Sequence, residues 1–222
     1  PTIGRMIPTA QLSLNESLVA LDRAHLVHPV ANWRGHEQRG ATVLQSGRGA
    51  WLRDAEGREL LDAFAGLWCV NIGYGHDSVV EAAARQMRQL PYATGYFGYA
   101  SEPAIELAAK LVEIAPAGLD HVYLTLGGSE AVDAAVRLIV QYYNSTGRPK
   151  KKQFIAIERG YHGSSSTGAG LTALPAFHRG FDLPRPEQHY IPSPYPYRNP
   201  VGSDAQAVIA SSVAALRAKV NE

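Results

Sequence analysis

The stretch that decides the fold is LTLGGSEA at residues 124–131. The overlapping run HVYLT, at residues 121–125, is apolar, aromatic and β-branched, which predicts a buried strand. Two glycines then break the pattern, Ser129 is a good helix N-cap, and apolar residues recur at helical spacing. A strand, a glycine turn and a helix start form an anion site, because unpaired N–H groups meet the positive end of the helix dipole. This order indicates either a phosphate site at Gly128 and Ser129 or a plain turn.

A second strand is expected at residues 154–158 (FIAIE), which would complete a βαβ unit with a parallel pair of strands. Open α/β sheets bind ligands at the carboxyl ends of their strands. We therefore expect residues 160–163 (GYHG) to open onto the same edge as Ser129. Tyr161 offers an aromatic face there, whereas His162 is either a site residue or a hydrogen-bonded structural histidine. The run at residues 163–170 is small and is expected to be flexible.

Composition indicates an ordinary globular protein of 222 residues with 45% hydrophobic residues and a net charge of +1. A net charge this small does not indicate a nucleic-acid-binding surface. No apolar run is long enough to span a membrane. The single cysteine, Cys69, excludes an internal disulfide framework, and the N-terminus lacks the layout of a signal peptide. We expect a soluble, cytoplasmic protein without nucleic-acid or membrane partners.

The N-terminal region predicts a small antiparallel unit, with strands at residues 50–53 and 58–62 joined by a turn. Two aromatic and glycine-rich segments follow, at residues 64–76 and 92–99. Irregular backbone that carries large side chains often lines a pocket. The alternative for the first segment is a buried loop anchored by Trp68.

Further helices are expected at residues 14–26, 77–90, 101–114 and 204–222. Ser13 or Asn15 caps the first of them and Asp204 the last. Residues 1–12 are expected to be an irregular arm, and residues 171–203 are rich in proline and loops. The last helix reaches Glu222 without a following strand, which suggests a truncated chain.

Three motifs together carry a family resemblance: GLWCVNIGYG at residues 66–75, GSEA at 128–131 and GYHGS at 160–164. In this order and at these separations they resemble the class III aminotransferases, which use pyridoxal 5'-phosphate (PLP). The run from Trp68 to Val70 is typical of the ω-amino acid:pyruvate (ω-transaminase) branch. The resemblance extends over residues 25–222 and corresponds to the N-terminal half of the family's chain.

The resemblance implies the α/β architecture of a fold-type I PLP-dependent transferase. Its large domain has a mostly parallel sheet flanked by helices, and its small α+β domain is built from both chain ends. Residues 1–76 would form the N-terminal arm and part of the small domain. Residues 77–222 would form the N-terminal portion of the large domain. A homodimer or homotetramer with the active site at a subunit interface is also implied.

The resemblance also assigns site residues. The cofactor-binding positions are Gly127, Gly128, Ser129, Tyr161, His162 and Gly163, with Gly128 and Ser129 at the phosphate and Tyr161 stacked on the pyridine ring. The substrate-pocket positions are Trp68, Tyr96, Phe97 and Tyr161. Glu130 would support the helix start, and no metal ligand is implied. These roles suit the residue types, because a phosphate fits a helix N-terminus and a flat ring fits a tyrosine face.

The chain departs from the family pattern at three points. Gly127 stands where the family commonly has serine, which removes one side-chain donor to the phosphate. Val30 stands where related amine-accepting enzymes often have phenylalanine. The chemistry also needs a lysine for the internal aldimine and an aspartate at the pyridine nitrogen. The chain has five lysines, none in such a motif: Lys110, Lys150, Lys151, Lys152 and Lys219.

We therefore expect the intact enzyme to transfer an amino group from an ω-amino acid, diamine or amine to pyruvate or another keto acid. Residues 1–222 are expected to hold no catalytic residue and to be inactive alone. The first alternative is a non-catalytic module that binds phosphate or mediates dimerisation. The second is another class III aminotransferase, of the ornithine type or the aminomutase branch. A nucleotide-binding domain is disfavoured, since no Walker or dinucleotide fingerprint is present.

Overall fold

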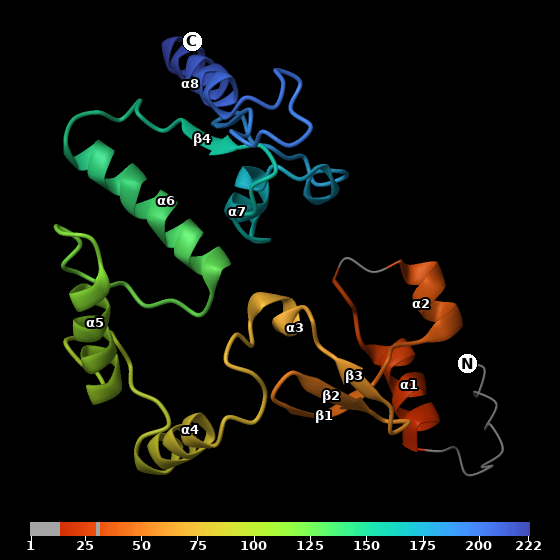
Figure 1. The fold of residues 1–222 in the computed structure, drawn as a ribbon. Helices are drawn as coiled ribbons and strands as arrows, with labels where there is room; N and C mark the ends of the chain where they lie inside the picture. The colour runs from red at the N-terminus through yellow and green to blue at the C-terminus, as the bar shows by residue number, and fades with distance from the viewer. Residues whose placement is uncertain (1–13, 30–31) are drawn as a thin grey trace, which may run out of the picture. The chain divides into compact units, whose positions relative to one another are not determined.

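The computed structural model describes residues 14–29 and 32–222. The contacts divide the chain into a first unit, Pro1–Tyr99, and a second unit, Ala100–Glu222 (Figure 1). The predicted N-terminal arm, the expected cap Ser13 and the family departure at Val30 lie outside the described residues. The division after residue 76, which the family resemblance implies, stays a prediction.

The first unit contains a three-stranded antiparallel sheet, in the order β1-β2-β3 (Figure 1). Its strands are β1 (Leu44–Arg48), β2 (Trp51–Asp54) and β3 (Glu59–Leu61). Trp51 faces Leu61 in the β2–β3 register, which confirms the predicted hairpin. Gly49 makes the turn between β1 and β2 at a φ of 57°, a left-handed conformation that glycine adopts without strain.

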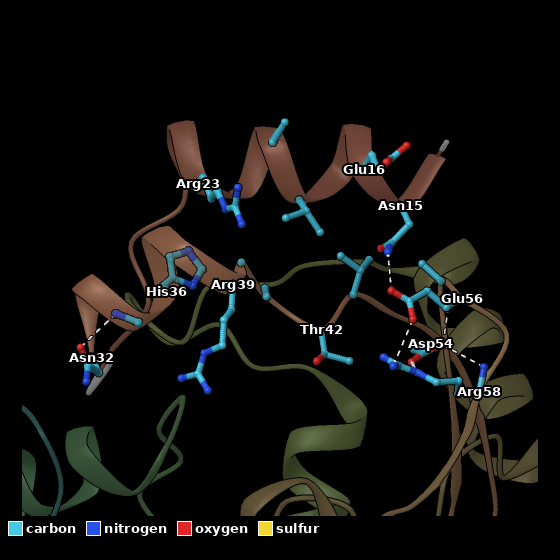
Figure 2. Close-up of a pocket in the computed structure, with 17 residues that line it drawn as sticks. Asn15, Glu16, Arg23, Asn32, His36, Arg39, Thr42, Asp54, Glu56 and Arg58 are labelled. Atoms are coloured by element: carbon cyan, nitrogen blue, oxygen red, sulfur yellow. Dashed lines mark hydrogen bonds and ion pairs between the residues drawn. The ribbon is translucent and has the colours of Figure 1, made fainter. Parts of the chain in front are cut away.

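Four helices complete the described part of the first unit: α1 (Leu14–His25), α2 (Trp33–Arg39), α3 (Ala65–Trp68) and α4 (Asp77–Gln89). The expected cap Asn15 is wrong, because α1 already begins at Leu14. Asn32 caps α2 instead, its side chain accepting from the N–H of Gly35 at 3.1 Å. Residues of α1, α2, the segment before β1 and the β2–β3 turn line a cavity of about 720 Å³ (Figure 2).

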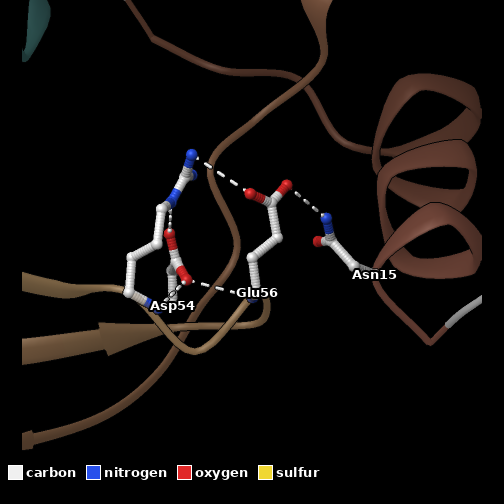
Figure 3. Close-up of polar contacts among 4 residues, drawn as sticks. Asn15, Asp54 and Glu56 are labelled. Atoms are coloured by element: carbon white, nitrogen blue, oxygen red, sulfur yellow. Dashed lines mark hydrogen bonds and ion pairs between the residues drawn. The ribbon is translucent and has the colours of Figure 1, made fainter.

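Asp54 organises the turn between β2 and β3 (Figure 3). Its carboxylate, 2% exposed, accepts from the N–H groups of Glu56 and Arg58 at 3.0 and 2.9 Å and from Nε of Arg58 at 2.7 Å. Burial raises the pKa of Asp54, but these hydrogen bonds favour the charged form and bring the pKa below its ordinary value of 3.8. Glu56 then accepts from Asn15 at 3.0 Å, so the turn is tied to α1.

The second unit contains α5 (Glu102–Ile114), α6 (Gly128–Ser145), β4 (Phe154–Ile157), α7 (Ser166–Leu171), a 3₁₀ turn η1 (Pro175–Phe177), β5 (Gln188–Ile191) and α8 (Ala205–Asn221). The predicted strand at residues 121–125 is wrong. That segment forms no strand, and Tyr123 and Leu124 are exposed. An extended apolar run becomes a strand only beside a partner, and the described strand next to β4 is β5.

β4 and β5 pair in parallel, Phe154 opposite Gln188 and Ile157 opposite Ile191. The parallel pair is thus present, but its second strand comes from the region expected to be loops. Residues 163–170 also differ from expectation, because they include most of α7, whose Gly168, Ala169, Gly170 and Leu171 are buried. Glycine at position 170 permits this packing, since a Cβ there would lie 1.9 Å from Oε1 of Gln188.

The core of the second unit lies where α7 and α8 contact the β4–β5 pair. Its most buried side chains include Ala156, Ile191 and Val208. Asp204 caps α8 as predicted, accepting from the N–H of Gln206 at 2.8 Å. Among the helices that the structure describes, none combines the length and apolarity needed to cross a membrane.

The Asp54 turn predicts an acid-sensitive step in unfolding. Because the pKa of Asp54 is lowered on folding, its charged form adds stability above the ordinary carboxyl pKa, and this stability is lost as the pH falls through the lowered value. Asp54→Asn should lower the free energy of unfolding at neutral pH and flatten its decline toward about pH 3. Urea unfolding across this range measures both effects. Asp182→Asn, at an exposed carboxylate, is the matched control. If the free energy of unfolding of Asp54→Asn fell at acid pH as steeply as that of the parent protein, Asp54 would not be the group responsible.

Candidate functional site: a phosphate cup and an aromatic turn

The start of α6 is an open helix N-terminus. Its N-cap is Gly127, in extended conformation with a φ of −172°, so the expected cap Ser129 is wrong. Ser129 is the second residue of the helix. The N–H groups of this first turn have no intrahelical acceptor. Gly128 faces open space, because a Cβ built on it would meet nothing within 4 Å. The geometry therefore leaves room for an anion at this end of α6.

The loop of residues 161–165 is fastened to this helix start. The N–H of Ser164 donates to Oγ of Ser129 at 3.1 Å, and Oγ of Ser165 donates to Oδ1 of Asp133 at 2.8 Å. Gly163 lies directly against Ser129: a Cβ at position 163 would be 2.6 Å from Oγ of Ser129, and the φ of 114° disfavours any side chain. Two segments more than 30 residues apart thus form one surface, which we call the phosphate cup (residues 127–129 and 161–165).

The buried Thr172 hydroxyl holds the loop in this shape. Thr172 is fully buried, its Oγ1 accepts from the N–H of His162 at 2.8 Å, and its hydroxyl donates to the carbonyl of Gly163 at 2.9 Å. Both backbone groups of the loop turn are therefore satisfied away from water. Sequence reasoning missed Thr172, because a threonine at the end of a short helix carries no motif of its own.

Tyr161 and His162 lie on the rim of the cup. Tyr161 is 58% exposed, and its ring meets Phe177 edge to face at 5.6 Å between centroids. This contact leaves the tyrosine ring exposed to a flat ligand. The His162 ring lies near Gly160, where a Cβ would come within 3.2 Å of Nε2. The carboxylate of Glu130 folds back toward Gly127, within 3.1 Å of the place of a Cβ there. An anionic group in the first turn stabilises the helix start, in line with the expected supporting role of Glu130.

In the first unit, the aromatic segment is a strained turn rather than a plain loop. Residues 65–68, which form α3, all have positive φ angles between 48° and 63°. Such left-handed backbone is unfavourable for residues with a Cβ and persists only when its surroundings enforce it. The turn leaves Trp68 70% exposed, with its ring 4.9 Å from that of Phe64. This exposure rules out the alternative of a loop anchored by a buried Trp68, and the role of Trp68 as a pocket wall stays a prediction.

Asp62 enforces this turn. Its carboxylate accepts from the N–H of Phe64 at 3.1 Å, the N–H of Gly66 at 2.7 Å and the hydroxyl of Tyr74 at 2.8 Å. The Tyr74 hydroxyl, together with the backbone N–H groups, lowers the pKa of Asp62 despite desolvation. The same hydrogen bond raises the pKa of Tyr74. Asp62 follows a strand without any motif, so only its contacts identify it as the support of the turn.

The structure therefore assembles the predicted residues in two groups. The expected cofactor residues meet in the phosphate cup of the second unit. Trp68, Tyr96 and Phe97 belong to the first unit, where Tyr96 and Phe97 lie next to each other with centroids 6.0 Å apart and Phe97 is 92% exposed. The cavity of the first unit is lined by none of the expected site residues. A phosphate at a helix N-terminus needs open N–H groups rather than an enclosed cavity.

Removing the Thr172 hydroxyl should loosen the phosphate cup. Thr172→Val keeps the shape but leaves the N–H of His162 and the carbonyl of Gly163 unpaired, so unfolding should become easier by about 1–3 kcal/mol. Denaturant unfolding measures the loss. Thr146→Val is the control, since that hydroxyl bonds the carbonyl of Tyr142 at an exposed helix end. Equal effects of the two substitutions would contradict the proposed support.

Asp62→Asn should release the strained turn. The neutral amide loses the charge that holds the N–H groups and the Tyr74 hydroxyl, so chymotrypsin should cleave near Trp68 faster than in the parent protein. Because the pKa of Asp62 is lowered, protonation at acid pH should loosen the parent turn in the same way, as hydrogen exchange at Gly66 would record. Asp120→Asn, at an exposed carboxylate, provides the comparison. Cleavage that is equally fast in the parent protein would count against the clamp.

The chain is similar to known proteins over most of its length. The family model "Aminotransferase class-III" matches residues 34–222. The putrescine–pyruvate aminotransferase of Pseudomonas aeruginosa is 41% identical over 178 residues, which cover 80% of this chain and 39% of the relative. The diaminobutyrate–2-oxoglutarate transaminase of Halomonas elongata is 38% identical over 84% of this chain and 40% of its own length.

A solved structure is similar as well. The ω-transaminase of Pseudomonas jessenii, in complex with pyridoxamine 5'-phosphate (PMP), superposes with a TM-score of 0.89 at 34% identity, covering 91% of this chain and 45% of that one. The chain thus spans about two fifths of the curated relatives. The likeness confirms the expected fold-type I α/β class, and PLP is the cofactor of the family. With the match over residues 34–222, the chain belongs to the class III aminotransferases.

Proposed function

We propose that this chain supplies the cofactor-phosphate site of an ω-transaminase that moves an amino group from an ω-amino acid, diamine or amine to pyruvate or another keto acid. The observation that carries the proposal is the hydrogen bond from Ser164 to Ser129, because it closes the 161–165 loop onto the start of α6. The names of the two relatives, which pair a diamine or a diamino acid with a keto acid, support this donor and acceptor class.

The residues of the cup fit the phosphate of PLP. Gly128 leaves the first-turn N–H groups accessible, and the Ser129 hydroxyl keeps its proton as a donor while its oxygen accepts from Ser164. Gly127 can offer only its backbone. Gly163 fits only without a side chain, and the exposed Tyr161 ring can stack on the pyridine of the cofactor. When bound, PLP supplies the aldehyde and the electron-accepting ring on which transamination depends.

The aromatic residues of the first unit are proposed as walls of the substrate pocket. Trp68 stands on a turn held by Asp62, whereas Tyr96 and Phe97 lie on a second exposed loop. Aromatic walls with few polar groups suit an amine donor with an aliphatic or aryl body. The hydrogen bonds of Asp62 hold the backbone of the Trp68 turn, which reduces the cost of ordering this segment on binding.

We further propose that the chemistry uses a lysine other than the five in this chain. Lys110 and Lys219 form ion pairs with Glu113 and Glu222 on the surface, and Lys151 lies over the ring of Tyr143 at 4.8 Å. The proposed homodimer is supported by exposed apolar side chains, among them Leu126 at 99% and Phe97 at 92% exposure, since soluble proteins seldom leave such surface uncovered. A cytoplasmic location completes the proposal.

Binding of PMP to the purified chain tests the cup, because PMP carries the phosphate but cannot form a Schiff base with any lysine. PMP should bind more tightly than pyridoxamine, which lacks the phosphate. Ser129→Ala should weaken PMP binding by roughly tenfold, the value of one hydrogen bond to a charged group. Ser145→Ala, at the opposite end of α6, should leave it unchanged. Fluorescence titration measures all four affinities, and equal binding of PMP and pyridoxamine would overturn the assignment.

The reaction itself is tested separately. Formation of alanine from pyruvate with putrescine, β-alanine or an aryl-ethylamine as donor should require a form of the protein that contains the lysine. Residues 1–222 should bind PMP without turnover. If they turned yellow with PLP and lost that colour with an amine donor, a lysine of this chain would be the reactive one and that part of the proposal would fail. PMP binding without turnover in any form would favour the non-catalytic module instead.

A further inference from the structure

Three side chains that could bind a metal ion meet between α1 and α2 in the first unit: Asp22, His28 and His36. Asp22 lies on α1, His28 follows that helix, and His36 lies on α2. Nε2 of His28 is 2.7 Å from Oδ1 of Asp22, and Nε2 of His36 is 3.0 Å from Oδ2. The centroids of the two imidazole rings are 4.5 Å apart. The carboxylate therefore stands between two imidazole nitrogens contributed by separate segments.

Hydrogen bonding does not satisfy the buried atoms of this cluster. The side chains of Asp22 and His36 are only 10% and 12% exposed. Oδ2 of Asp22 and Nε2 of His36 are both buried, and neither has a hydrogen-bond partner among the described residues. They are close enough to bond, but they are not aligned to do so. A buried polar atom without a partner is unfavourable and calls for a water or an ion that neighbouring groups share.

We propose that Asp22, His28 and His36 form a binding site for a divalent transition metal ion, with Zn²⁺ as the first candidate. Two imidazole nitrogens and one carboxylate oxygen are a donor set that Zn²⁺ takes, whereas Ca²⁺ and Mg²⁺ prefer oxygen ligands. Ligand atoms of a tetrahedral zinc site lie roughly 3.3 Å apart, given bonds of about 2.0–2.1 Å. One donor atom from each of the three residues lies within 4.8 Å of the other two, so small side-chain shifts would bring them to this spacing.

A cavity borders the proposed site on the side of His36. His36 also lines the cavity of about 720 Å³, where Figure 2 draws it on α2 next to α1. Water from this cavity can complete a site with three protein ligands. Arg23 and Arg39 line the same cavity, so a hydroxide or another small anion is favoured there over a neutral ligand. The ion would cross-link α1 to α2, and the site uses no residue of the phosphate cup.

Metal binding to the chain, prepared without a polyhistidine tag and freed of metal with EDTA, tests the site. Titration calorimetry with ZnCl₂ should give one ion per chain with micromolar or tighter affinity, and MgCl₂ should give no binding. His28→Gln and His36→Gln should each weaken Zn²⁺ binding by more than roughly tenfold. His121→Gln is the matched control, because that histidine is 94% exposed and pairs with the exposed neighbour Asp120.

A second readout covers the case in which the buried variant fails to fold. Co²⁺ bound to the unsubstituted protein should show the visible absorption of a four-coordinate site and should be displaced by Zn²⁺. His28→Gln, at the most exposed of the three positions, should lose this absorption while its circular dichroism is unchanged. Binding weaker than about 100 µM, or binding that only His121→Gln reduces, would overturn the proposal and leave a metal-free carboxylate between two histidines.

Discussion

The loop at residues 161–165 of the second unit depends on one buried hydroxyl. Thr172 pairs with the N–H of His162 and the carbonyl of Gly163, which shapes the loop that meets the start of α6. From this turn, Ser164 reaches Ser129 and Ser165 reaches Asp133. The bonds from Ser164 and Ser165 join segments more than 30 residues apart in the chain. The cup therefore exists only when β4, α7 and α6 are all in place. The proposed phosphate site is thus a product of packing, although its residues lie in short local motifs.

In the first unit, a strained turn at residues 65–68 presents the exposed side chain of Trp68. Four successive residues in left-handed conformation would relax without support, because three of them, Ala65, Leu67 and Trp68, carry a Cβ that crowds the backbone there. Asp62 supplies that support through two backbone N–H groups and the hydroxyl of Tyr74. Asp54 acts similarly one turn earlier in the sheet, where it gathers the N–H groups of Glu56 and Arg58. In both places a carboxylate satisfies backbone that no strand or helix can satisfy.

An exposed apolar segment of the second unit has the composition of a buried strand. The segment expected as a strand at residues 121–125 is unpaired, and the following Leu126 is 99% exposed. Its composition is that of a strand buried on both faces, which is stable only between neighbours. Sequence periodicity records this tendency correctly, yet the described residues offer β4 no partner other than β5. The proposed homodimer and the family architecture would both bring further chain to such surfaces.

The sequence by itself determined five of the helices (α1, α4, α5, α6 and α8) and the β2–β3 hairpin, since apolar periodicity, Asp204 as a cap and a polar turn are local signals. Through three linked motifs it also determined the class III aminotransferase family. Only the tertiary structure decided that β5 is the partner of β4, that Gly127 caps α6 and that Ser129 is freed to hold the 161–165 loop. It alone revealed the roles of Thr172 and Asp62 and the meeting of Asp22 with two histidines. The physical reason is that pairing, hydrogen-bond satisfaction and burial depend on residues distant in the chain, which no local pattern encodes.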